Sequence, residues 1–305
     1  MSSLYFIIGP TAVGKSALAL EWAWRNGAEI LYCDAFCVYR GMDIGTAKPD
    51  AAERATVPHH GIDLVDARQP FSVADYVAES RRVVEDCAAR GRPLLVSGGS
   101  GFYLRSFFHP VLDDTQVPDE IRAGVRELMR RAGPDGLRAE LLRLNPGGVS
   151  GVDMLNPRRV QAALERCLAA GRPLAELQQA YRNMPEPYPG VGKRICTLSR
   201  SREDLWERIQ ARARAMIKAG LVEEVKALRE AGFEKNLSAS SAIGYREALR
   251  WLDSGSADTD ALADEIALNT RKLVKKQLAF FRTQLPPQKV LELAPNEAPR
   301  ADALF

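Results

Sequence analysis

The chain has 305 residues, of which 46% are hydrophobic and 27% are charged, and its formal net charge is +3. These proportions are ordinary for a globular protein; they exclude a disordered chain, and the length allows one large domain or two moderate ones. The excess of positive charge is too small to identify a nucleic-acid partner by itself.

The five cysteines are odd in number and include no Cys-x-x-Cys pair, which argues against a disulfide framework or a zinc site. With only three histidines, at positions 59, 60 and 109, we expect no metal centre built from histidine and cysteine. No apolar run is long enough to span a membrane, and the N-terminus does not resemble a signal peptide. We therefore predict a cytoplasmic protein with no membrane partner.

Short apolar segments that are typical of buried strands alternate with helical segments in the first hundred residues. Strands are predicted at 4–8, 29–33 and 93–97, with a further strand at 193–198, and a helix is predicted at 73–90. This alternation predicts an α/β fold, a mostly parallel sheet flanked by helices.

The strand pattern stops between residues 113 and 189, where the sequence favours helices instead. Asn156 and Pro157 are typical of a helix start, with asparagine as the N-cap and proline in the first turn. We predict an inserted all-helical domain at 113–189 within a core formed by 1–112 and 190–305. After residue 201 the core is predicted to be helical, and the chain from about residue 286 is predicted to be a loose tail.

The first strand is followed by a motif that is typical of phosphate binding. The segment GPTAVGKS fits G-x-x-x-x-G-K-[ST], and it lies between a predicted strand and a predicted helix, as in P-loop NTPase-like folds. Its glycines allow backbone N–H groups to face phosphate oxygens, its lysine adds a positive charge, and its serine can bind Mg²⁺. The predicted diphosphate-binding residues are Gly9, Pro10, Thr11, Ala12, Val13, Gly14, Lys15 and Ser16, with Ser16 as the metal ligand.

Asp34 follows the second predicted strand. Ligands of doubly wound sheets bind at the carboxyl ends of the strands, so this carboxylate could orient a metal ion or accept a proton. It could equally be a solvated turn residue or a helix cap. The third strand ends in GGSG without an acidic residue, which disfavours a motor ATPase but leaves small-molecule kinases and other diphosphate enzymes open.

Residues 260–282 are predicted to form one long amphipathic helix. Its apolar residues share one side, whereas Arg271, Lys275 and Arg282 lie on the opposite side. The basic side is compatible with a solvated surface and with contacts to a nucleic-acid backbone.

Several motifs, in order, resemble those of the bacterial tRNA dimethylallyltransferases, also called tRNA isopentenyltransferases. The resemblance runs from the P-loop to about residue 282 and includes DAFCVYRGMDIGTAKP, PHHGIDLVD, GGSGFYL, NPRRVQAALE, AIGYRE and TRKLVKKQLAFFR. The residues Ala35, Cys37, Ala162 and Ser241 differ from those usual in the family. No zinc-finger extension resembling that of the eukaryotic relatives follows the last motif.

The resemblance implies a P-loop core with an inserted helical domain that binds tRNA. The implied reaction transfers a dimethylallyl group from dimethylallyl diphosphate to N6 of the adenosine that follows the anticodon on its 3′ side. It implies Asp34 as the general base, Arg212 as a neutraliser of the leaving diphosphate, and Ser100 beside the adenosine. The tRNA contacts that we expect, with Arg271 and Lys275 added from the basic helix, are Asp34, Ala35, Phe36, Cys37, Ser100, Arg122, Arg158, Arg159, Val160, Gln161, Ala162, Ser241, Ala242, Ile243, Gly244, Tyr245, Arg246, Arg271 and Lys275.

Three other functions remain possible at this stage. An adenylate isopentenyltransferase would share the P-loop and Asp34 but would not need a large tRNA-binding insertion. A small-molecule P-loop kinase would use Asp34 as a base toward a hydroxyl group. A non-catalytic nucleotide-binding module would use the basic helix alone to contact nucleic acid. The expected partners of the favoured enzyme are the tRNA anticodon stem-loop and dimethylallyl diphosphate, with Mg²⁺ as cofactor and a monomeric state.

Overall fold

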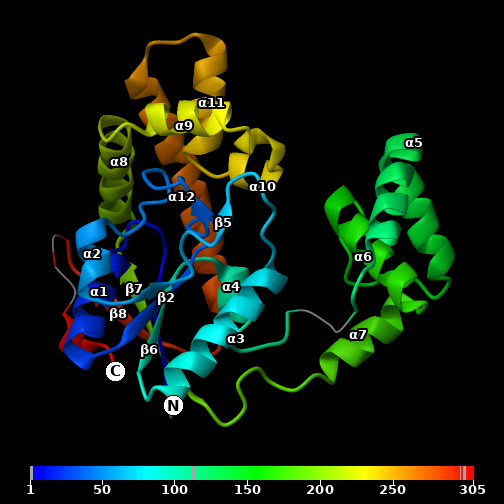
Figure 1. Ribbon diagram of the computed structural model, residues 1–305, viewed down its shortest axis with the longest axis horizontal. Helices are drawn as coiled ribbons and strands as arrows, with labels where there is room; N and C mark the ends of the chain where they lie inside the picture. Colours follow the sequence, from blue (N-terminus) through cyan, green and yellow to red (C-terminus); the bar gives the residue numbers. More distant parts are fainter. Residues whose placement is uncertain (1–2, 112–114, 296, 298–299) are drawn as a thin grey trace. The chain divides into compact units, whose positions relative to one another are not determined.

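The computed structural model describes residues 3–111, 115–295, 297 and 300–305. The chain divides into two compact units: one is formed by residues 1–108 and 188–305, and the other by residues 109–187 (Figure 1). The helical unit therefore begins and ends slightly earlier than the insertion predicted at 113–189. Within the described ranges, no helix has the length and apolar character that crossing a membrane requires.

The first unit is built on a six-stranded sheet in which every neighbouring pair is parallel, with strand order β4-β2-β6-β1-β7-β8. This confirms the predicted α/β fold, and the four predicted strands correspond to β1, β2, β6 and β7. The strands are β1 (Ser3–Ile8), β2 (Glu29–Cys33), β4 (His59–His60), β6 (Leu94–Gly98), β7 (Gly192–Arg200) and β8 (Lys289–Leu293).

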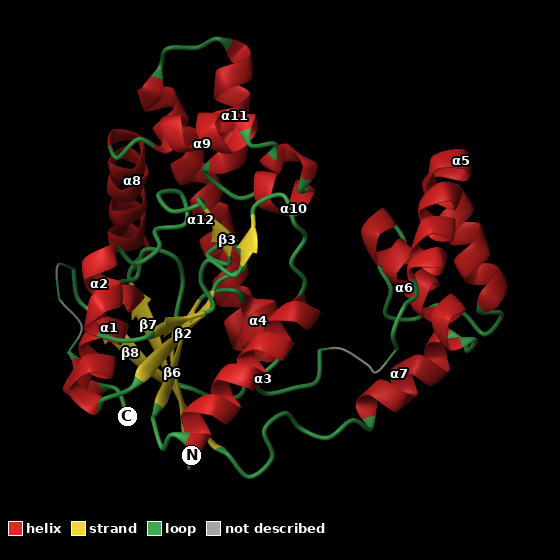
Figure 2. Ribbon diagram, viewed as in Figure 1, coloured by secondary structure: helices red, strands yellow, loops and turns green. Residues whose placement is uncertain are grey.

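Helices cover both faces of the sheet (Figure 2). Because side chains alternate along a strand, Ile30 and Leu95 belong to one hydrophobic core while Leu31 and Val96 belong to the other. The first core includes α1 (Lys15–Asn26), and the second includes α3 (Val73–Ala89) and α4 (Gly101–Arg105). Because helices cover both faces, every residue of β2 and β6 is buried and most of these residues are apolar.

The remaining long helices of this unit follow β7 and pack beyond the carboxyl ends of the strands (Figure 1). The long helix α12 packs along α8, and α11 packs on both α9 and α12. These helices are α8 (Arg202–Lys218), α9 (Leu221–Glu230), α11 (Tyr245–Ser254) and α12 (Thr259–Gln284). The short elements are β3 (Tyr39–Arg40), α2 (Ala51–Thr56), β5 (Val65–Asp66), η1 (Phe233–Lys235) and α10 (Leu237–Ser240).

The C-terminal segment, residues 286–305, is not the loose tail that we predicted. It adds β8 in parallel beside β7 and ends in η2 (Ala301–Ala303). Leu293 and Leu304 are buried in the protein, and the ring of Phe305 packs against Trp22. The prediction was wrong because a five-residue edge strand carries too little periodic signal to be distinguished from a loop.

In the described part of the second unit the helices are α5 (Asp119–Leu144), α6 (Pro157–Ala170) and α7 (Leu174–Arg182). Its own core includes Leu137, Leu141 and Leu164. Helix α5 is interrupted at Gly133, whose φ of 65° is not helical. Asn156 caps α6 as predicted, because its side chain accepts hydrogen bonds from the backbone N–H groups of the first turn.

One histidine and one cysteine lie beside a carboxylate in the first unit. Our expectation of no metal centre built from histidine and cysteine stays a prediction. Glu29, His60 and Cys87 place one potential ligand atom each within 4.8 Å of the others, at the amino end of β2 and therefore away from the P-loop. The Glu29 carboxylate already accepts hydrogen bonds from Arg90 and His60, so the Arg90 guanidinium of the same chain balances its negative charge. The three residues come from separate elements, and their spacing in the chain therefore gave no signal.

Candidate active site

The P-loop connects β1 to α1 at the carboxyl edge of the sheet. Gly9 has a φ of 153°, and a Cβ atom at this position would lie 2.8 Å from the carbonyl oxygen of Leu198, so only glycine fits against β7. The carbonyls of Ala12 and Val13 accept hydrogen bonds from Arg208 and Arg200, at 2.8 and 2.9 Å. Because the peptide unit is planar and trans, the N–H that follows the Val13 carbonyl points to the opposite side.

Lys15 is the charged residue of the P-loop. Its Nζ donates a hydrogen bond to the carbonyl of Pro10 at 2.8 Å. Burial and the nearby positive charge of Arg212 lower the pKa of Lys15 to about 7, and the charge of Asp34 opposes this effect only in part. A bound diphosphate would supply the negative charge that favours the protonated lysine.

Asp34 lies in the turn after β2, where its Oδ1 accepts hydrogen bonds from the N–H groups of Phe36 and Cys37 at 2.8 and 3.3 Å. The turn is also held by Ser100, whose Oγ accepts a hydrogen bond from the N–H of Ala35 at 2.9 Å. The sequence had left open whether Asp34 was a cap, a turn residue or a catalytic group. The structure shows a turn residue that also lines two cavities.

A polar cavity of about 70 Å³ lies beside the P-loop. Its lining includes Lys15, Ser16, Tyr32, Asp34 and Arg212. Two of these residues carry hydroxyl groups, two are cationic and one is a carboxylate, which is the chemistry that a diphosphate with a divalent cation requires.

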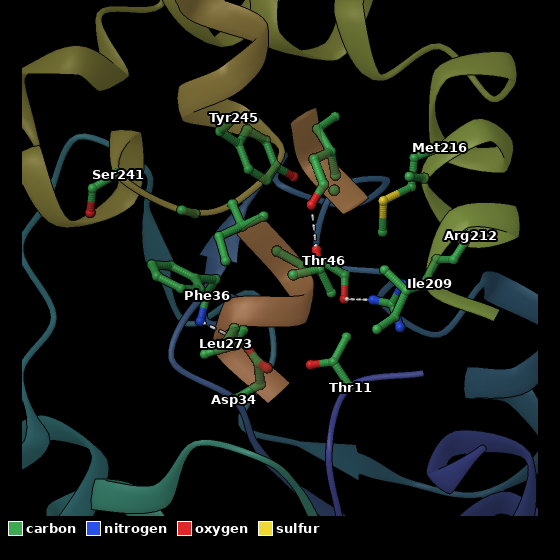
Figure 3. Close-up of a pocket in the computed structure, with 16 residues that line it drawn as sticks. Thr11, Asp34, Phe36, Thr46, Ile209, Arg212, Met216, Ser241, Tyr245 and Leu273 are labelled. Atoms are coloured by element: carbon green, nitrogen blue, oxygen red, sulfur yellow. Dashed lines mark hydrogen bonds between the residues drawn. The ribbon is translucent and has the colours of Figure 1, made fainter. Parts of the chain in front are cut away.

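A larger cavity of about 280 Å³ opens beside it, and most of its lining is apolar. Figure 3 shows Ile209, Arg212 and Met216 from α8 on one side and Phe36 and Ser241 on the other, with Asp34 and Thr11 at its base. Four residues line both cavities: Thr11, Asp34, Thr46 and Arg212. The two cavities therefore meet where a carboxylate and a guanidinium face the same space.

Arg212 projects from α8 into this junction, where its Nη2 donates to the carbonyl of Thr46 at 3.5 Å. Burial lowers the pKa of Arg212, while Asp34 acts in the opposite direction. A guanidinium keeps its charge even in such surroundings. Among the residues that the structure describes, no carboxylate is hydrogen-bonded to this buried cation, so an anionic ligand would compensate its desolvation.

Glu224 of α9 is a site residue that the sequence analysis missed. Its carboxylate accepts hydrogen bonds from three successive backbone N–H groups, those of Asp43, Ile44 and Gly45, and from the hydroxyl of Tyr245 at 2.6 Å. It thereby fixes the loop that carries Thr46. A Cβ atom on Gly45 would lie 2.4 Å from the Tyr245 ring, which explains the glycine in the motif GMDIGTAKP.

Gln277 of α12 was also missed. Its Oε1 accepts a hydrogen bond from the N–H of Thr11 and its Nε2 donates to the carbonyl of Gly99, both at 3.0 Å. It therefore joins the P-loop to the GGSG loop. The signal that could have found it is its place in the motif TRKLVKKQLAFFR.

Among the other predicted tRNA-contacting residues, Gly244 is the N-cap of α11, and Arg246 in the first turn of that helix forms an ion pair with Glu247. The rest fall into three groups. Ser241, Ala242, Ile243 and Tyr245 line the apolar cavity. Lys275 is exposed on α12, whereas the Arg271 guanidinium lies over the Trp206 ring with 5.1 Å to its centroid. Arg122 and residues 158–162 belong to the helical unit, where the Val160 side chain is buried in the core.

The chain is similar to several known proteins. Residues 37–284 match the IPP transferase family. A tRNA dimethylallyltransferase of Opitutus terrae is 50% identical over 95% of this chain and 93% of its own length, and one of Geobacter metallireducens is 39% identical over 92% and 89%.

Solved structures give the same result. A tRNA isopentenylpyrophosphate transferase from Bacillus halodurans matches with a TM-score of 0.69 and 30% identity, over 97% of this chain and 92% of that one. A eukaryotic dimethylallyltransferase, solved in a study of its action on tRNA, shares the fold with a TM-score of 0.84 at 23% identity, over 100% of this chain and 76% of that one. The chain belongs to the tRNA dimethylallyltransferase family.

Proposed function

We propose that this protein transfers a dimethylallyl group from dimethylallyl diphosphate to N6 of the adenosine next to the anticodon of tRNA, on its 3′ side. The observation that carries the proposal is the junction of the two cavities at Asp34 and Arg212. A polar cavity that suits a diphosphate opens there into an apolar cavity that suits a prenyl chain and a base.

The P-loop side would hold the leaving group. As the bond between the prenyl carbon and the diphosphate oxygen breaks, negative charge grows on the diphosphate. The protonated Lys15, the N–H of Gly14 and the guanidinium of Arg212 are positioned to stabilise that charge. The hydroxyl of Ser16 lines the same cavity and is a hard oxygen donor that fits Mg²⁺. When bound, Mg²⁺ would neutralise part of the diphosphate charge.

The base would enter the apolar cavity. The adenine must leave the stack to reach the reacting carbon, and the segment 241–245 with Phe36 offers a mostly apolar surface for the flipped base. N6 forms a bond to the prenyl carbon while the bond from that carbon to oxygen breaks. Asp34 uses Oδ1 in its own turn, so we assign Oδ2 as the acceptor of the N6 proton.

The acceptor tRNA would be recognised by surfaces outside these cavities. The helical insertion, predicted at 113–189, carries Arg122, Arg158 and Arg159, and α12 carries the exposed Lys275. These cations would contact phosphates of the anticodon stem-loop. We further propose that the protein acts as a monomer in the cytoplasm, where its five free, buried cysteines would stay reduced.

The experiment is to incubate the protein with Mg²⁺ and radiolabelled dimethylallyl diphosphate together with an unmodified tRNA transcript or with AMP. We expect label on the tRNA and none on AMP. Label on AMP alone would indicate an adenylate isopentenyltransferase, and consumption of ATP in place of the prenyl donor would indicate a kinase. Either result contradicts the proposal.

The assignment of the base has its own prediction. Asp34→Asn should reduce turnover by about a thousandfold, within the range that a positioned general base contributes, while tRNA still binds. Asp66→Asn, which changes a half-buried aspartate of the same unit that lines neither cavity, is the matched control and should remain active. Normal turnover of Asp34→Asn at saturating substrates would show that another group takes the proton.

A further inference from the structure

Arg200 stands at the end of β7 with its side chain almost completely buried. The guanidinium makes four hydrogen bonds of ordinary length. Its Nε donates to the carbonyl of Val13 at 2.9 Å, and Nη1 donates to the carboxylate of Asp204 at 2.8 Å. The other two bonds reach the carbonyls of Ala294 and Glu297 at 2.9 and 2.6 Å.

On one side, this guanidinium sets the conformation of the P-loop. Val13 and Gly14 share a peptide unit, so holding the Val13 carbonyl outward directs the N–H of Gly14 the other way. A Cβ atom on Gly14 would lie 3.9 Å from the nearest guanidinium nitrogen of both Arg200 and Arg208, so the two side chains flank this glycine. Arg208 holds the preceding carbonyl, that of Ala12, in the same manner.

On the other side, the guanidinium is fixed by the C-terminal segment. Ala294 and Glu297 bond to each other, because the N–H of Ala294 donates to Glu297 Oε2 at 2.8 Å and the N–H of Glu297 donates to the Ala294 carbonyl at 3.1 Å. This arrangement places both carbonyls on Arg200. The segment is anchored beyond this point by the buried Leu304 and before it by β8.

The family match ends at residue 284, so the C-terminal segment lies outside it. The ion pair with Asp204 would by itself satisfy the charge of Arg200. The two carbonyls of the C-terminal segment also fix the orientation of the guanidinium plane, because a planar guanidinium that donates on several sides is oriented by all of its acceptors. A lysine could keep the charge but could not reach Val13, Asp204 and the segment in this geometry.

We propose that Arg200 is a positioning residue through which the C-terminal segment holds the diphosphate loop in its binding conformation. This inference rests on the proposed function for its substrate class. The loop that Arg200 positions is the P-loop, which would receive dimethylallyl diphosphate. Arg200 itself contacts the outer side of the loop and not the substrate.

The first test is Arg200→Lys in the full chain. We expect KM for dimethylallyl diphosphate to rise about tenfold, because a charged hydrogen bond to the loop is lost. We expect kcat and KM for tRNA to change less than about twofold. Inorganic pyrophosphate, measured by calorimetry, should lose affinity by the same factor as the prenyl donor. A purely structural role would lower the melting temperature and the active fraction without changing either affinity.

The second test is removal of residues 294–305, with Glu297→Ala as a milder variant should the truncated protein not fold. Both should weaken pyrophosphate binding, and combining either with Arg200→Lys should add little, since the two changes break the same connection. Arg25→Ala is the matched control, because it breaks an exposed ion pair to Asp302 of the same segment and does not touch the P-loop. Its pyrophosphate affinity should equal that of the unaltered protein.

The inference fails if Arg200→Lys binds pyrophosphate normally, or if the effects of Arg200→Lys and Glu297→Ala are fully additive. The proposed function is tested separately by prenylation of tRNA by the unaltered protein in the same assay. Should that reaction not occur, the pyrophosphate measurements still decide whether Arg200 couples the segment to the loop.

Discussion

At the scale of single residues, the site depends on charges that change with their surroundings. Lys15 is the clearest case, because its pKa is lowered to about 7 in the absence of an anion. About half of the lysine side chains are then neutral near pH 7. Binding of a diphosphate favours the protonated form, so binding at higher pH is accompanied by proton uptake.

We therefore predict that pyrophosphate affinity falls as pH rises above 7. The fall should approach about tenfold per pH unit once Lys15 is mostly neutral in the free protein. Calorimetry between pH 6.5 and 8.5 measures it, and Lys15→Arg is the control because arginine stays charged over this range. The ionisation of pyrophosphate is common to both proteins and cancels in the comparison. Parallel pH profiles for the two proteins would contradict the prediction.

Glu29 gives a prediction about stability. Hydrogen bonds from Arg90 and from His60 outweigh burial and lower the pKa of Glu29 from 4.5 to about 2. A carboxylate with a lowered pKa in the folded state stabilises the protein above the unfolded pKa, and that contribution is lost as pH falls from about 4.5 toward 2.

Glu29→Gln should therefore destabilise the protein by about 2 kcal/mol at pH 7, because it leaves a cationic partner without its buried carboxylate. The difference from the unaltered protein should shrink as the pH approaches 2. Urea unfolding at pH 7, 4 and 3 measures the free energy of unfolding in both proteins. Glu79→Gln, which breaks a more exposed ion pair on α3, is the control. A pH-independent difference would show that the charge of Glu29 is not the cause.

At the scale of elements, α12 serves two purposes on two sides. Gln277 faces inward and joins the P-loop to the GGSG loop, whereas Lys275 faces solvent. The apolar stripe was predicted from the periodicity, and Leu262 and Ile266 are indeed buried. The inward role of Gln277 was not predicted, because one polar residue beside an apolar stripe gives no periodic signal.

Replacing Arg271 and Lys275 with alanine should weaken tRNA binding. If both contact phosphates, the slope of log affinity against log salt should become less steep by about 2. Filter binding at several salt concentrations measures it, with Lys226→Ala on α9 as the control. Arg271→Ala alone should also lower stability slightly, because its guanidinium lies over Trp206. An unchanged salt slope would assign this side of α12 to the solvated surface.

At the scale of the whole molecule, the chain has separate hydrophobic cores in its two units. The core of the helical unit includes Leu164, which is completely buried, and the sheet core includes Leu95. A compact unit with its own core can lose stability without equal loss in the other.

Leu164→Ala should cost about 3 kcal/mol of local stability, as truncation of a buried leucine does. We expect tRNA affinity to fall near the melting temperature of the helical unit while pyrophosphate affinity stays normal. Leu95→Ala is the matched variant, and it should affect pyrophosphate binding first. Calorimetric melting together with the tRNA and pyrophosphate binding assays would distinguish the effects of the two variants. Equal loss of both affinities in Leu164→Ala would mean that the units do not act independently.

The sequence by itself determined the features that depend on neighbours in the chain. The alternation of apolar strands and helices set the α/β class, because each strand must bury both faces. The motif GPTAVGKS indicated a phosphate-binding loop, because its glycines, lysine and serine perform their functions within a few residues of one another. Asp34 was placed at the carboxyl edge by its position after a strand, although the sequence left its role open.

Only the tertiary structure decided which distant residues complete the site. The N–H of Thr11 bonds to a side chain 266 residues away, and the carbonyl of Val13 to one 187 residues away. The Glu224 carboxylate accepts hydrogen bonds from the backbone of a loop about 180 residues away in the sequence. Such partners have no fixed spacing, since they are brought together by helices packing on a sheet. The same physics turned the predicted loose tail into an edge strand, because pairing with β7 satisfies a backbone that local sequence alone could not assign.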